Sequence, residues 1–97
     1  MPDNQSRLDA IRKRFLGRLS EQRDMLERMS GLERSDDEIL DIVHKIAGIA
    51  GSLGYPALSA AASEVELLLV DTSPAALQET AQFKRLMQQV DAALEQT

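Results

Sequence analysis

His44 is the only histidine in this 97-residue chain, and the glycines that follow it indicate which chemistry it could carry out. On a helix, Gly48 lies one turn beyond His44 and Gly51 lies two turns beyond it, roughly on the same strip. A glycine inside a helix costs about 0.5–1 kcal/mol relative to alanine, which this chain uses freely elsewhere. The surface beside the imidazole is therefore cleared of side chains, which favours the approach of a large partner to an exposed nucleophile.

Two common kinds of histidine chemistry match the sequence poorly. The chain has no cysteine and no second histidine, so a metal site would be short of its usual nitrogen and sulfur ligands, and we expect none. Asp37 and Asp41 are near His44 in the sequence and could join a weak cation site, but such a pair is typical of a solvated face. No serine has the nucleophile-elbow context of a hydrolase triad.

The remaining chemistry is nucleophilic attack by a neutral ring nitrogen on an electrophile that a partner brings, such as a phosphoryl group. The simplest alternative is a boundary histidine without chemistry, which is common on amphipathic helices. The apolar stripe of this helix is expected to be Ile39, Ile42, Val43, Ile46, Ile49, Ala50 and Leu53. His44 falls beside that stripe, so its side chain should be at least partly exposed.

Four helical segments are expected to position His44, because apolar residues recur every three or four positions along the chain. In chain order the segments are about Ser6–Met29; a segment capped by Ser35 that stops at Gly54; Pro56 to about Asp71; and a segment capped by Ser73, with Pro74 in its first turn, that runs to about Glu95. The connections are short, so successive helices should be antiparallel. The sequence therefore predicts one all-α domain over 1–97, an antiparallel up-down-up-down four-helix bundle.

The terminal helices are expected to bury particular residues. The buried face of the first helix should carry Leu8, Ile11, Phe15, Leu19, Leu26 and Met29, and that of the last helix should include Leu77, Thr80 and Phe83. The first residues of the first helix carry no apolar stripe. We therefore expect its N-terminal end to extend beyond the bundle.

The net charge of −5 is unevenly distributed. Residues 1–34 carry eight basic and six acidic residues, whereas residues 35–97 carry three basic and ten acidic residues. The basic residues of the first part are interleaved with acids, which is typical of a solvated helix face, so nucleic-acid binding is not expected. The N-terminus is polar, unlike a signal peptide, and no segment approaches the roughly 18 consecutive apolar residues of a membrane span. We expect a free-standing, monomeric cytoplasmic protein that does not bind membranes.

The sequence around His44 resembles the histidine-containing phosphotransfer (HPt) family. The family pattern is a histidine, a glycine four residues later, a stretch of small residues that ends in an apolar residue and glycine, and then a helix with alanines and an apolar-Glu pair. The run from His44 to Gly54, followed by Ala61, Ala62 and Val65-Glu66, contains these elements in order. Glu66 itself we interpret as a plain surface glutamate.

The resemblance implies a phosphorelay intermediate of two-component signalling. His44 would accept a phosphoryl group from an aspartate of a response-regulator receiver domain and pass it to another receiver or return it. Asp41, Gly48, Gly51, Ser52 and Tyr55 would belong to the docking surface for the receiver. A hybrid histidine kinase is a further possible partner. The chain would need no cofactor of its own, since the receiver would supply the magnesium ion, and no ATP-dependent kinase activity is expected.

One position departs from the family pattern. Many members have a lysine three residues after the histidine, where it offsets phosphate charge, and this chain has Ala47 there. Lys45 is the nearest cation and is expected to neighbour the phosphate, although a plain solvated lysine is an equal alternative. A histidine-kinase dimerisation domain fits less well, because its histidine is usually followed by glutamate. The alternative function is a helical adaptor or inhibitor that docks a receiver or a partner helix without carrying phosphate.

Overall fold

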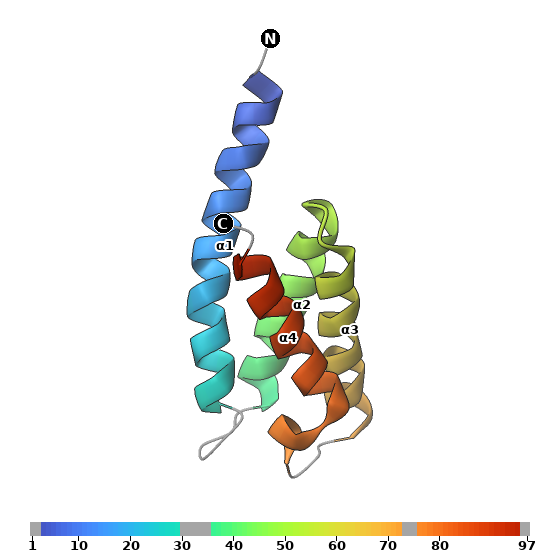
Figure 1. Cartoon of the computed structure of the whole chain (residues 1–97). Coiled ribbons are helices and arrows are strands. Elements are labelled where there is room, and N and C mark those ends of the chain that lie inside the picture. The colour runs from blue at the N-terminus through green and yellow to red at the C-terminus, as the bar shows by residue number, and fades with distance from the viewer. Residues whose placement is uncertain (1–2, 30–35, 73–75, 96–97) are drawn as a thin grey trace.

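The computed structural model describes residues 3–29, 36–72 and 76–95, and these residues form a helical bundle. The elements are α1 (Asp3–Met29), α2 (Asp36–Ser52), α3 (Pro56–Asp71), the short 3-10 helix η1 (Leu77–Glu79) and α4 (Ala81–Glu95), with no strand among the described residues. Figure 1 shows the four α-helices gathered side by side. The predicted all-α class is confirmed.

The first helix is much longer than the others. It contains 27 residues, whereas α2 contains 17, so at about 1.5 Å per residue α1 exceeds α2 by roughly 15 Å. Figure 1 shows the N-terminal turns of α1 projecting past the other helices, as the sequence predicts, and the molecule measures 51 × 21 × 20 Å. The helix begins at Asp3 rather than near Ser6.

The core is aliphatic, as expected from a chain with only three aromatic residues. Its fully buried large side chains come from every helix: Leu19, Leu26, Ile39, Val43, Ile46, Leu58, Val65, Leu77, Leu86 and Val90. Three residues predicted to lie in the buried stripes are instead half exposed, namely Leu8, Ile11 and Ile49. Leu8 lies toward the projecting end of α1, and Ile11 and Ile49 line a groove between α1 and α2, so the core does not cover them.

The connection between α2 and α3 follows the local sequence signals. Gly54 adopts a positive φ of 88°, a backbone conformation that glycine accepts without a Cβ penalty. The Tyr55 N–H then donates to the Ala50 carbonyl, which closes the end of α2. Pro56 begins α3, where its missing N–H leaves no helix bond unmade. The predicted stop at Gly54 is confirmed, whereas the predicted cap at Ser35 lies outside the described residues.

The start of the last helix differs from the prediction. Ser73 and Pro74 lie outside the described residues, but α4 begins only at Ala81, so the expected inclusion of Leu77 and Thr80 in this helix is wrong. The Thr80 hydroxyl accepts a hydrogen bond of 3.2 Å from the Phe83 N–H, as an N-cap side chain does. Leu77 is fully buried from the preceding η1 turn, so this short helix contributes to the core before α4 starts.

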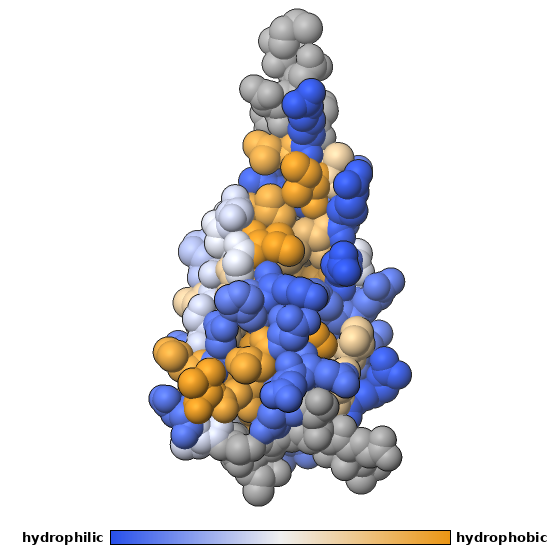
Figure 2. Space-filling view, turned by 180° about the vertical axis from the view of Figure 1, so that it is seen from behind, coloured by the Kyte–Doolittle hydropathy of each residue, from blue (hydrophilic) through white to orange (hydrophobic). Residues whose placement is uncertain are grey.

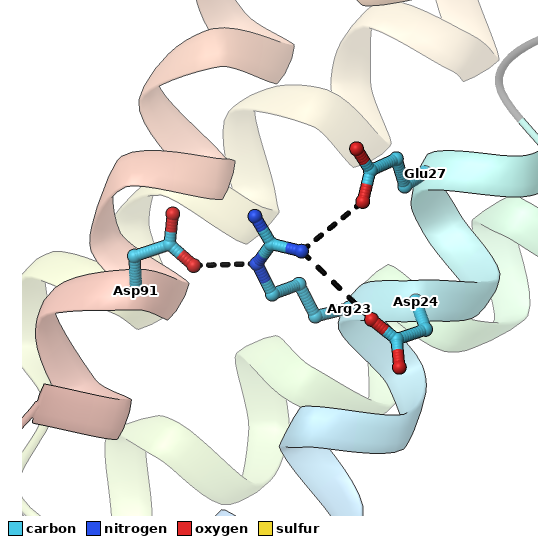
Figure 3. Close-up of polar contacts among 4 residues, drawn as sticks. All are labelled: Arg23, Asp24, Glu27 and Asp91. Atoms are coloured by element: carbon cyan, nitrogen blue, oxygen red, sulfur yellow. Dashed lines mark hydrogen bonds and ion pairs between the residues drawn. The ribbon is translucent and has the colours of Figure 1, made fainter.

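Arg23 joins the first and last helices. Its guanidinium on α1 donates to the carboxylate of Asp91 on α4 and lies 3.1 Å from Glu27 on its own helix (Figure 3). Asp91, and secondarily Glu27, raises the pKa of the Arg23 guanidinium, because a carboxylate partner stabilises the charged form. This ion pair helps to fix α1 against the bundle.

Candidate functional site

The imidazole of His44 lies on the surface of α2 with 72% of its side chain exposed, in agreement with the prediction. Its Nδ1 atom is 2.7 Å from Oε2 of Glu66 on α3, whose side chain is only 29% exposed. The Nδ1 edge of the ring is thus held from the neighbouring helix, while most of the side chain is exposed to solvent.

The contact with Glu66 indicates which ring nitrogen carries the proton of the neutral imidazole. An ionised carboxylate can only accept hydrogen bonds, so Nδ1 must carry the proton that it shares with Glu66. In the neutral ring the lone pair then belongs to Nε2. The arrangement gives the ring a partner at Nδ1 and leaves the Nε2 lone pair unengaged by Glu66.

Gly48, one turn beyond His44, leaves open space on this surface. A Cβ atom built on Gly48 would meet no atom within 4 Å, and the residue is exposed. Packing inside the bundle therefore gives no reason for a glycine here.

Gly51 has a different surrounding from Gly48. A Cβ atom on Gly51 would lie 3.3 Å from Oγ of Ser59 on α3, and that hydroxyl donates a 2.8 Å hydrogen bond to the carbonyl of Ala47. The missing side chain at Gly51 thus lets α3 approach α2 closely. The close approach at Gly51 lies about two turns along the same helix pair from the contact between His44 and Glu66.

Comparison with known proteins adds one finding. A family model of the Hpt domain matches residues 10–96, nearly the whole chain. The chain belongs to the Hpt family. No curated protein and no solved structure matches it.

Membership of the Hpt family supports a phosphotransfer role in two-component signalling. Hpt domains are phosphocarriers rather than kinases, and they interact with receiver domains in phosphorelays. An exposed imidazole held at Nδ1 by a carboxylate is compatible with such a carrier. Among the described residues, no three carboxylate or histidine side chains are grouped to hold a metal ion. No described helix is long and apolar enough to span a bilayer.

Glu66 is the site residue that sequence reasoning missed. The interpretation of Glu66 as a plain surface residue is wrong, because the carboxylate bonds to His44 from the adjacent helix. The place of Glu66 in the apolar-Glu pair of the Hpt pattern was the feature of the sequence that could have identified it as a site residue. The sequence separation of 22 residues hides the contact from any reading of helix periodicity.

Two predicted docking residues of this Hpt domain have structural contacts of their own. Ser52 is exposed on the last turn of α2, and its hydroxyl donates to the Gly48 carbonyl at 3.2 Å. Tyr55 is half-buried, and its ring centroid lies 5.6 Å from that of Phe15 on α1. Tyr55 therefore packs the start of α3 against α1 and offers only part of its surface to a partner.

Lys45 is paired with Asp41 at rest. The ammonium lies 3.0 Å from the Asp41 carboxylate one turn earlier on α2, and both side chains are more than half exposed. An exposed pair of this kind contributes little to stability, so the lysine is free to exchange partners. Lys45 also lines the groove between α1 and α2, whereas Glu66 contacts His44 from α3.

Proposed function

We propose that this Hpt domain is a phosphorelay intermediate in which His44 accepts a phosphoryl group from a receiver-domain aspartate. It then passes the group to another receiver or returns it. The observation that supports this most directly is the exposed imidazole whose Nδ1 is held by Glu66, so that Glu66 does not engage Nε2. The open surface at Gly48 supports the same role, because a receiver must bring its aspartyl phosphate within bonding distance of Nε2.

The proposed step is an in-line transfer. The Nε2 lone pair attacks the phosphorus of the partner's acyl phosphate, the new N–P bond forms, and the P–O bond to the aspartate breaks. The electron pair of that bond leaves with the aspartate carboxylate. The ring becomes cationic as Nε2 bonds to phosphorus, and Glu66 stabilises this charge by accepting the Nδ1–H bond. The reverse sequence returns the group to a receiver.

The magnesium ion for this transfer is proposed to belong to the receiver, where it would screen the charge of the phosphoryl oxygens. Asp41, Gly48, Gly51, Ser52 and Tyr55 remain the proposed docking residues. Their surroundings favour Gly48 and Ser52 for direct contact, and Gly51 and Tyr55 for support of the surface. Lys45 is proposed to leave Asp41 and neighbour the phosphoryl group once His44 is modified.

The proposal also covers the direction of the helices, the oligomeric state and the partners. We take the four helices to alternate in direction, up-down-up-down, which is in keeping with the short 53–55 connection and with the colour order along the bundle in Figure 1. A monomer is proposed, since four helices can close a core without a second chain. The partners are receiver domains, with a hybrid histidine kinase as a possible source of phosphate.

The test of the proposal is phosphoryl transfer from a radiolabelled, phosphorylated receiver domain. Wild-type protein should acquire a label that is acid-labile and base-stable, as phosphohistidine is, and His44→Gln should acquire none. Circular dichroism of both proteins should be the same, since His44 is exposed. Absence of label on the wild type across a panel of receivers would exclude phosphotransfer and favour the adaptor or inhibitor.

A further inference from the structure

A groove of about 590 Å³ lies between α1 and α2, beside the turn of α2 that carries His44. Its apolar lining consists of Ile11 and Phe15 from α1 and Ile46 and Ile49 from α2. Ile11 and Ile49 are 46% and 44% exposed, far more than the core residues of the bundle. The space-filling view from behind shows apolar surface between hydrophilic edges in the upper half of the molecule (Figure 2).

The rim of this groove is basic although the whole chain is acidic. Lys13, Arg14 and Arg18 from α1 and Lys45 from α2 line it, against a single acid, Glu21. The three α1 cations form no ion pair with any residue that the structure describes, whereas Lys45 is paired with Asp41. The net charge of the chain is −5, so this strip is a local reversal of sign. Unpaired cations beside an exposed apolar floor fit an acidic, amphipathic partner surface.

We propose that the groove binds an acidic amphipathic helix on the protein that reaches His44. The apolar ridge of that helix would enter between Ile11 and Ile49, and its flanking carboxylates would pair with Arg14 and Arg18. This inference rests on the proposed function, and it deepens it by naming the charge and shape of the partner's docking element. The α1 cations then select among partners whose other surfaces are similar, because a helix flanked by cations is repelled.

Other occupants fit the groove less well. A second copy of α1 would bring Arg14 and Arg18 against the same cations, which opposes pairing. A nucleic acid would satisfy the cations but has no apolar ridge for Ile11 and Ile49. A helix that lies in the groove would also contact Lys45, the residue next to His44, so binding there holds a partner beside the phosphoacceptor.

The experiment uses two synthetic helical peptides that share a leucine ridge and differ in their flanks, one with glutamates and one with lysines. Binding to the full chain is measured by fluorescence anisotropy, and the site is mapped by amide chemical shifts. The glutamate-flanked peptide should bind at least about tenfold more tightly, since charge complementarity discriminates between partners on this scale, and should shift Ile11, Lys45 and Ile49. In Arg14→Glu/Arg18→Glu the preference should reverse.

The matched control is Lys84→Glu/Arg85→Glu on α4, which changes the net charge by the same amount outside the groove. It should keep the preference of the wild type. Equal binding of the two peptides, binding of neither, shifts confined to other surfaces, or concentration-dependent dimerisation through the groove would overturn the proposal. Binding to anionic phosphatidylglycerol vesicles without binding of the glutamate-flanked peptide would overturn it as well.

A separate measurement distinguishes this proposal from the phosphorelay function. Phosphoramidate, a small phosphoryl donor, can modify an exposed imidazole without docking, so it should label wild type and Arg14→Glu/Arg18→Glu equally. Receiver-dependent labelling should fall at least about tenfold in the variant only. Equal receiver-dependent labelling of both proteins would refute docking in the groove and would still support the phosphorelay function. Selective peptide binding without labelling by any receiver would refute the phosphorelay function and would still support helix binding in the groove.

Discussion

The Glu66 carboxylate on α3 lies 2.7 Å from Nδ1 of His44 on α2, and because an ionised carboxylate can only accept, this contact leaves the lone pair of the neutral ring on Nε2. The bond crosses between helices, so it depends on how closely α2 and α3 pack. Gly51 and Ser59 allow that close packing. The orientation of the His44 ring is thus tied to the interface between two helices.

Removal of the Glu66 carboxylate should slow phosphoryl transfer to His44. Glu66→Ala loses both the orientation of the ring and the stabilising charge, so a decrease of about tenfold is expected, in line with about 1–2 kcal/mol for a charge-assisted bond. Glu66→Gln keeps an acceptor oxygen and should lose less. Rapid-quench kinetics with a phosphorylated receiver measure the rates. Glu64→Gln, which breaks only the exposed pair with Arg85, is the control and should transfer at the wild-type rate. Equal rates for Glu66→Ala and wild type would refute the positioning role.

Substitutions at Gly48 should affect folding stability and receiver docking in different ways. Gly48→Ala places a Cβ in open space and removes the glycine penalty, so the free energy of unfolding should rise by about 0.5–1 kcal/mol. Gly48→Leu should also fold, but its side chain would stand on the surface beside His44 and slow transfer from a receiver by at least about tenfold. Thermal unfolding and transfer rates test both effects. Labelling by phosphoramidate should stay close to wild type in Gly48→Leu, and a fall there would point to a damaged imidazole instead.

Gly51 should behave differently from Gly48, although both are glycines of the same helix. In Gly51→Ala the new Cβ would crowd the Ser59 hydroxyl, so the helix-propensity gain of about 0.5–1 kcal/mol should be offset in whole or part. Adding Ser59→Ala removes the crowded atom, and the double variant should be more stable than the sum of the single changes predicts. Denaturant unfolding of the four proteins gives this coupling. Strict additivity would show that the contact is unimportant.

The Arg23–Asp91 pair should affect stability and leave transfer unchanged. Asp91→Asn should lower the free energy of unfolding by up to about 1 kcal/mol, because the pair is partly exposed and solvent screens it. Asp91 raises the pKa of Arg23, so the contribution of the guanidinium persists below its ordinary pKa and is lost only as the pH rises through the raised value. Arg23 therefore stays charged across neutral pH, and its titration should not change the difference in free energy of unfolding between wild type and Asp91→Asn in that range. A change in the transfer rate would show instead that α1–α4 docking shapes the site.

Lys45 is expected to protect the phosphorylated form. In Lys45→Gln the cation nearest to His44 along α2 is removed, and the half-life of the phosphohistidine should shorten by up to about fivefold, the size expected for one exposed charge. Asp41→Asn releases Lys45 from its resting partner and should lengthen the half-life slightly. Loss of label from purified phosphoprotein measures both. If neither substitution alters the half-life, Lys45 is a solvated lysine without a role at the phosphate.

The sequence by itself determined the helical class, the exposure of His44, the stop at Gly54 and the start of α3 at Pro56. These features are local, because a period of 3.6 residues and the φ preferences of glycine and proline act within one turn. Sequence motif and spacing around His44 also carried the family resemblance, which the family model confirms over residues 10–96.

Tertiary structure alone decided which residues of different helices meet. It brought Glu66 to His44, set Ser59 against Gly51, left Ile11 and Ile49 to line a groove, and moved the start of α4 to Ala81 behind the buried Leu77. Periodicity gives the face on which a residue lies but neither the register nor the rotation of one helix against another. Those quantities follow from the packing of the whole core, so the exposure of His44 could be predicted from the sequence, and its contact with Glu66 could not.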